Sequence, residues 1–138
     1  MTAANSNHKL QLGQIGESIA QKYLISKKYK ILDKNYFLKT KTNRKLGEID
    51  LIAKKGSVYV FIEVKTIAGR EGRRFPPAAK INRVKIKKLI RVGESWLKNH
   101  KLSLTVRWQI DIITIEIDII RKKALVRHYE NAIEDIKK

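Results

Sequence analysis

The sequence of 138 residues contains no cysteine, which excludes disulfide bonds, thiolate metal ligands and cysteine nucleophiles. It also lacks any run of about 20 apolar residues, the length that a membrane-spanning helix needs. Its first ten residues show no apolar run of the kind found in secretory signals. We therefore expect a cytoplasmic protein with no membrane partner. Without repeats or linkers, a chain of this length predicts one domain at 12–138, after a flexible N-terminus at 1–11.

Acidic residues are scarce as well: 13 Asp and Glu stand against 31 Lys and Arg, a formal net charge of +18. Such an excess costs self-repulsion that no fold requires, so it indicates a polyanionic partner. We expect contacts with a nucleic-acid backbone from Arg70, Arg73, Arg74, Lys80 and Lys87. For the lysines, which share one strip of a predicted helix, the alternative is an ordinary solvated face.

The spacing of apolar residues predicts the order α-β-β-β-α-β-β. Helical spacing covers 12–24 and about 78–99. Runs of β-branched and aromatic residues predict strands at 29–38, 46–53, 58–65, 104–117 and about 124–129. Both prolines and two glycines lie in 68–77, which we expect to be a mobile loop. This order indicates an α/β sandwich with helices flanking a mixed sheet of about five strands.

The few acidic residues concentrate in the hairpin predicted over 46–65. If it closes on a two-residue turn at Lys55 and Gly56, Asp50 lies opposite Phe61. Side chains alternate between the two faces of a strand, so one face is then entirely apolar. This face carries Ile49, Leu51, Ala53, Val58, Val60, Ile62 and Val64. The other face brings together the charged residues Glu48, Asp50, Glu63 and Lys65.

Carboxylates that face one another on a sheet repel, and desolvation increases the cost. A divalent cation relieves this repulsion, and oxygen-only ligands suit Mg²⁺ or Mn²⁺. Asp50 and Glu63 are the natural pair of ligands, with Lys65 within reach of a bound water or a phosphate. Glu17 of the first helix could join them. Three alternatives stay open: Glu17 only complements its helix dipole, Glu48 is an exposed strand-end charge, and Lys65 merely pairs with Glu63.

Other polar residues indicate structural roles. Asp111 lies within an apolar strand and is expected to hold backbone or an arginine. Asn35 is expected at a bulge or turn. The three histidines, His8, His100 and His128, share no metal-ligand spacing and are expected on the surface.

Asp50, followed thirteen residues later by Glu63, Val64 and Lys65, matches the pattern of the PD-(D/E)xK nuclease superfamily. A longer match, from about 12 to 133, resembles the YraN-like family. It comprises, in order, Gly16-Glu17, Asn35, 47–52, 61–65, Lys85, Asp111 and Asn131-Ala132. The resemblance implies a restriction-endonuclease-like core related to archaeal Holliday-junction resolvases. The sequence departs from the family at Ile49, where proline is usual.

The resemblance also implies a site that depends on Mg²⁺ or Mn²⁺. The implied metal ligands are Asp50, Glu63, the Val64 carbonyl and Glu17. Lys65 would be the catalytic lysine, and Lys85 would contact phosphate.

We therefore predict a metal-dependent DNA endonuclease that recognises DNA structure rather than sequence. The resolvase resemblance suggests branched DNA, whereas linear duplex, flaps, single strands and RNA stay open. A homodimer, which junction recognition needs, stays open too. The main alternative is a non-catalytic nucleic-acid-binding protein that retains the nuclease fold, since it explains the charge equally well. A third reading is a scaffold that docks on an acidic protein.

Overall fold

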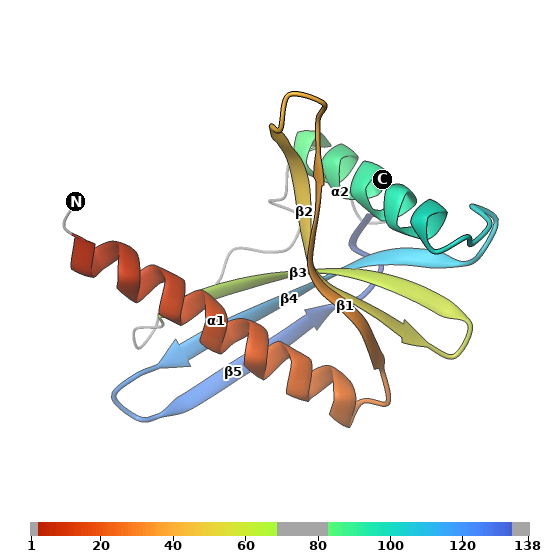
Figure 1. Cartoon of the computed structure of the whole chain (residues 1–138). Coiled ribbons are helices and arrows are strands. Elements are labelled where there is room, and N and C mark those ends of the chain that lie inside the picture. The colour runs from red at the N-terminus through yellow and green to blue at the C-terminus, as the bar shows by residue number, and fades with distance from the viewer. Residues whose placement is uncertain (1–2, 69–82, 134–138) are drawn as a thin grey trace.

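Two helices cover opposite faces of one five-stranded sheet in a computed structural model, which describes residues 3–68 and 83–133 (Figure 1). The elements are α1 (Ala3–Ser26), β1 (Lys30–Lys39), β2 (Lys45–Lys55), β3 (Val58–Ala68), α2 (Arg83–Asn99), β4 (Trp108–Asp118) and β5 (Lys123–Tyr129). This confirms the predicted α/β fold, its element order and its five strands. It is consistent with the restriction-endonuclease-like core that the resemblance implies.

The strands lie in sequence order, and only the β3–β4 pair is parallel. A parallel pair needs a crossover connection, and α2 lies within the segment that makes it. No described helix combines the length and the apolar composition needed to cross a membrane.

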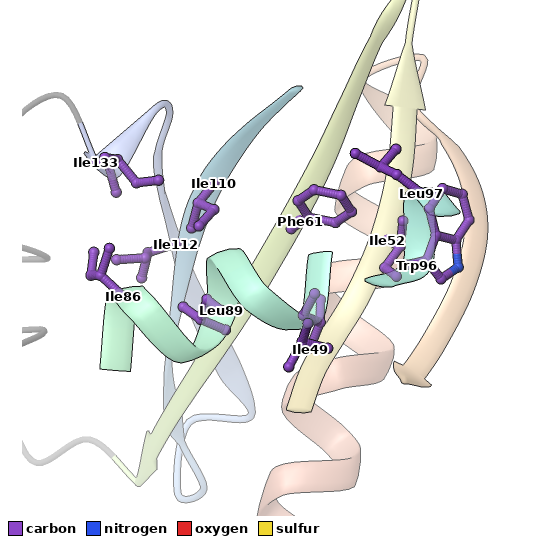
Figure 2. Close-up of a cluster of buried hydrophobic side chains, with 12 residues drawn as sticks. Ile49, Ile52, Phe61, Ile86, Leu89, Trp96, Leu97, Ile110, Ile112 and Ile133 are labelled. Carbon is purple, nitrogen blue, oxygen red and sulfur yellow. The ribbon is translucent and has the colours of Figure 1, made fainter. Parts of the chain in front are cut away.

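The sheet is buried on both faces. On one face, the apolar side of α2 packs on a cluster that includes Phe61, Ile110 and Ile112, as Figure 2 shows. On the other face, Ala20 and Leu24 of α1 pack on a second cluster of β2, β3 and β4 residues. Each large side chain fully buried in this way contributes roughly 1.5–3 kcal/mol. The two clusters therefore fix both helices to the sheet.

Among the described residues, two elements begin four or more residues away from the sequence prediction. Helix α1 begins at Ala3 rather than at residue 12, while the expected flexibility of 1–11 stays a prediction. Strand β4 begins at Trp108 rather than at residue 104. The reason is a turn, in which the amides of Thr105 and Val106 donate to the side-chain and carbonyl oxygens of Ser103. The predicted loop 68–77 lies outside the described residues beyond Ala68, as do the first residues of the long helix.

The predicted hairpin register is wrong by two residues. Ile52, not Asp50, lies opposite Phe61, and the turn residues are Gly56 and Ser57. Gly56 has a φ of 59°, which glycine adopts at little cost and which suits a tight hairpin turn. A shift of two residues leaves each side chain on its face, because the period of a strand is two.

One residue of β2 nevertheless changes face. Ile49 packs with Ile52 in the cluster under α2, whereas Leu51 and Ala53 pack under α1. The prediction placed Ile49 on the same face as Leu51. Regular alternation thus fails next to Asp50, where β2 and β3 stop pairing.

Two glycines of α1 provide a matched prediction. A Cβ added at Gly16 would lie 1.8 Å from Thr66 Oγ1 on β3, whereas one added at Gly13 would meet nothing within 4 Å. We expect Gly16→Ala to lower the free energy of unfolding by about 1–3 kcal/mol through overpacking. Gly13→Ala should raise it by up to about 1 kcal/mol through helix propensity. Urea denaturation measures both changes, and equal effects would contradict the close helix–strand contact.

Candidate active site

The candidate site lies where β2 and β3 separate. Their ladder ends at the pair Leu51–Ile62, and Figure 1 shows β2 turning away from β3 beyond it. The next residue, Asp50, accepts a hydrogen bond through Oδ2 from the backbone N–H of Val64, at 2.8 Å. Beyond the last ladder pair, the Asp50 side chain therefore bonds the β3 backbone in place of the β2 backbone. This hydrogen bond fixes the Asp50 carboxylate in the opening.

Glu63 brings a second carboxylate to the same opening. Its residue exposure is only 9%, and its Oε1 forms an ion pair of 2.5 Å with Lys85 Nζ of α2. Its other oxygen, Oε2, is buried and has no hydrogen-bond partner among the described residues. A buried acceptor left unsatisfied costs about 1–3 kcal/mol, and more when it is charged. This oxygen therefore has the environment of a cation ligand.

A cavity of about 290 Å³ connects these groups. It is lined by residues 45–48, Asp50, Glu63, Lys85 and Lys88, and we call it the acidic cleft. Glu48, a half-exposed residue, pairs with Lys45 at 2.8 Å. The alternative of an exposed strand-end charge does not hold, because Glu48 is the fourth residue of β2, is partly buried and borders the cleft. The structure thus brings together Glu48, Asp50 and Glu63.

Glu17 reaches the same carboxylates from α1. Burial raises its pKa, the charge of Glu48 raises it further, and a hydrogen bond from the Asn35 side chain lowers it. Asn35 has a φ of 53° but lies in a regularly paired stretch of β1, so the bulge or turn expected there is not found. The register shifts of β1 lie between Ile31 and Asp33 and between Leu38 and Lys39. The helix-dipole alternative for Glu17 is wrong. Since α1 begins at Ala3, Glu17 lies well beyond the first turn, where the dipole acts.

Asp50 is the carboxyl whose pKa is raised most by burial and by the neighbouring negative charges. Burial raises the pKa of its carboxyl from 3.8 to about 7, against the lowering effect of the Val64 N–H. The negative charges of Glu63, Glu17 and Glu48 add to the increase. Carboxyls from α1, β2 and β3 thus act on one another, and a cation among them would remove this repulsion. All the side-chain donors are oxygens, which suits Mg²⁺ or Mn²⁺.

Lys65 lies two residues after Glu63 on β3, half-buried and paired across the ladder with Thr114. It does not line the acidic cleft as the structure describes it. The alternative that Lys65 only neutralises Glu63 is not supported, because the described partner of Glu63 is Lys85. The metal-binding role of the Val64 carbonyl stays a prediction.

The basic residues expected to contact nucleic acid are only partly described. Lys87 is exposed on α2, as a solvated face requires, while Lys85 turns to Glu63. The other four, Arg70, Arg73, Arg74 and Lys80, lie outside the described residues.

A second polar cluster was not predicted from the sequence. Ligand atoms of Asp111, His128 and Glu130 lie within 4.8 Å of one another. His128 was expected on the surface, but its side chain is only 8% exposed. It is buried because β5 places it between Asp111 and α1, where its Nε2 lies 2.7 Å from Asp111 Oδ2 and its Nδ1 3.0 Å from Tyr23 Oη.

Protein groups already occupy this second cluster. Asp111 Oδ1 accepts hydrogen bonds from the backbone N–H of Asn131 at 2.9 Å and from the side-chain Nε2 of Gln109 at 2.8 Å. Tyr29 donates to Glu130 at 3.1 Å. The prediction that Asp111 holds backbone is confirmed. We infer that the cluster ties β4 to the end of β5, whereas the acidic cleft retains an unsatisfied oxygen.

This interpretation predicts a stability effect. Asp111→Ala would leave the backbone N–H of Asn131 without its acceptor and remove a fully buried carboxylate that also contacts His128. We therefore expect the free energy of unfolding to fall by about 2 kcal/mol. Asp118→Ala is the matched control, because Asp118 also accepts two backbone hydrogen bonds but is partly exposed at the end of β4. Its expected loss is below about 1 kcal/mol. Equal losses in urea denaturation would contradict the special role of Asp111.

Comparison with known proteins assigns the family. Residues 16–115 match the sequence profile of the uncharacterised protein family UPF0102. This span contains Glu17, Asp50, Glu63, Lys65 and Lys85. The chain is 36% identical over 122 residues to a UPF0102 protein of Alkaliphilus oremlandii, which covers 88% of this chain and 97% of the relative. A UPF0102 protein of Fervidobacterium nodosum is 39% identical over 124 residues, 86% of this chain and 78% of its own length. Another, from Geobacter metallireducens, is 32% identical over 130 residues, with coverage of 94% and 97%. The chain belongs to family UPF0102, the YraN-like family whose motifs it carries.

Proposed function

We propose that the protein is a metal-dependent DNA endonuclease that hydrolyses phosphodiester bonds at the acidic cleft. The observation that carries the proposal is the buried, unpartnered Oε2 of Glu63 beside a fixed Asp50. Lys85 pairs with the other oxygen of this carboxylate, Oε1, and Oε2 keeps no hydrogen-bond partner among the described residues. The non-catalytic alternative offers no reason for this arrangement.

The chemistry follows from the donor set. Asp50 and Glu63 would hold Mg²⁺ or Mn²⁺, with the Val64 carbonyl and Glu17 as further ligands. The bound ion supplies Lewis-acid activation of the phosphate and of the attacking water. Asp50 keeps its carboxylate oriented through the hydrogen bond from Val64. Lys65 orients the water and stabilises the charge that develops on the phosphate.

Lys85 has two roles in this proposal. Without metal it neutralises part of the charge on Glu63, at 2.5 Å. With a cation held by Glu63, the ammonium group of Lys85 would contact the phosphate backbone. Lys87 would add a further backbone contact from α2, and we propose the same role for Arg70, Arg73, Arg74 and Lys80, which lie outside the described residues. Contacts of this kind read the backbone and not the bases, so we propose recognition of DNA structure with a steep dependence on salt.

The test is cleavage of labelled four-way junction, flap, duplex and single-stranded DNA, with an RNA strand for comparison. Each substrate is incubated with Mg²⁺, Mn²⁺ or EDTA. We expect cutting that requires the metal and that Glu63→Ala loses, with the preferred substrate indicating whether paired sites of a homodimer are needed. Tight binding without cutting under any metal would contradict the proposal and favour the non-catalytic protein.

A further inference from the structure

A second cavity lies away from the acidic cleft, at the C-terminal end of α2 and the turn of the β2–β3 hairpin. Its volume is about 620 Å³. It is lined by Lys28, Lys30 and Lys54, and by an apolar and aromatic wall that includes Tyr59, Trp96 and His100. We call it the basic pocket. None of the described residues that line it is acidic, and the one carboxylate bound to its wall, that of Asp33, accepts a hydrogen bond from Trp96 Nε1 at 3.1 Å.

The fold forces its lysines together. Lys30 and Lys54 are direct partners across the antiparallel β1–β2 pair. Like charges in that position destabilise a sheet, typically by a few tenths of a kcal/mol or more. Lys28, with a φ of 73°, follows the end of α1 and brings a third ammonium group to the rim. Three cations around one cavity indicate an anion as the ligand.

The wall of the pocket suits a planar ring. The exposed ring of His100 stacks on buried Trp96, with centroids 4.0 Å apart and an angle of 24° between the planes. The ring centroids of Tyr59 and Trp96 lie 6.0 Å apart. Lys54 Nζ lies over the Tyr59 ring, 5.0 Å from its centroid. Aromatic rings beside ammonium groups are the elements that proteins use to hold a base and its phosphate.

We propose that the basic pocket binds one nucleotide unit, with the phosphate among the three lysines and the base against the aromatic wall. The unit could come from a free mononucleotide or from a nucleic-acid strand, since the chemistry is the same. Tyr59 precedes Glu63 by four residues on β3, which places the pocket about 13 Å from the acidic cleft. The proposal needs neither a metal nor cleavage, so it stands apart from the nuclease function.

The test uses Trp96 as a reporter. In a Trp108→Phe background, Trp96 is the remaining tryptophan, and its fluorescence is followed in EDTA during titration with deoxyadenosine monophosphate. We expect a saturable change that Lys30→Gln with Lys54→Gln weakens at least tenfold. The control is Lys22→Gln with Lys123→Gln, which removes the same charge from exposed sites elsewhere and should weaken binding less than twofold. Thermal melting of each variant checks that it is folded.

Further titrations decide the ligand. A short deoxyadenylate strand that binds at least tenfold more tightly than the mononucleotide, and loses this advantage in the pocket variant, identifies a strand as the source. Equal affinities identify a free nucleotide. Inorganic phosphate that matches the mononucleotide would overturn the proposal, because the base would then contribute nothing. No saturable change with either nucleotide probe, or equal losses in pocket and control variants, would overturn it too. Loss of metal-dependent cleavage alone would bear only on the acidic cleft.

Discussion

Replacing Asp50 by Asn or Glu63 by Gln is expected to lower DNA cleavage by about 10³-fold or more while leaving DNA binding equal or tighter. A catalytic metal contributes several kcal/mol to the transition state, and each 1.4 kcal/mol is a factor of ten in rate. Either substitution replaces a charged carboxylate by a neutral amide, a much weaker ligand for a divalent cation held by few carboxylates. It also removes a negative charge that faces the DNA, which explains why binding does not suffer.

The two effects are measured separately. Cleavage is followed with Mg²⁺ and binding with EDTA, at one salt concentration. Glu130→Gln is the matched control, because it changes a carboxylate of the second cluster while its amide oxygen can still accept the hydrogen bond from Tyr29. We expect the control to cleave like the parent. If Asp50→Asn and Glu63→Gln both cleave like the parent, the site has been assigned to the wrong residues.

The stability of the metal-free protein is expected to fall as the pH rises from about 4 to about 7. The folded state keeps the proton on Asp50 up to a pKa of about 7, whereas the unfolded chain loses it near 3.8. The folded state therefore binds more protons across this window, and stability decreases with pH until both states are ionised. At 1.36 kcal/mol for each pKa unit, the loss is about 4 kcal/mol at most.

Asp50→Asn isolates this contribution. The variant should match the parent near pH 4 and exceed its free energy of unfolding above pH 7, in EDTA. Mn²⁺ should restore the parent above pH 7 more than at pH 5, because metal binding needs the ionised carboxyl. Parallel pH profiles for the parent and Asp50→Asn would contradict a raised pKa of Asp50 in the folded state.

The fold could be predicted because its signals are local. Alternating apolar residues marked β2 and β3, and helical spacing marked both helices, so the element order and the mixed sheet followed. The hairpin register could not be predicted, because a turn at Lys55-Gly56 and one at Gly56-Ser57 have similar compositions. Both registers also place the same side chains on each face of the hairpin, so the apolar pattern does not distinguish them either.

The candidate site was predictable to the same extent. Asp50 and Glu63 were found because the predicted and the observed registers differ by two residues. Both registers therefore keep the two carboxylates on the same face of the hairpin. The part played by Lys85 in pairing with Glu63 was not found, since it depends on how α2 lies over the sheet. The buried position of His128 was missed for a similar reason. Tyr23 and Asp111, its partners, are distant in sequence and meet it only through the fold.

Mn²⁺ binding by electron paramagnetic resonance tests the central claim most directly, since it separates the acidic cleft from the second cluster without requiring a substrate. The parent and the variants Glu63→Gln and Glu130→Gln are titrated near pH 8. We predict saturable binding to the parent, at least tenfold weaker binding to Glu63→Gln, and binding to Glu130→Gln within twofold of the parent. Unchanged binding to Glu63→Gln, with a loss in Glu130→Gln, would place the metal at Asp111, His128 and Glu130 and contradict the account.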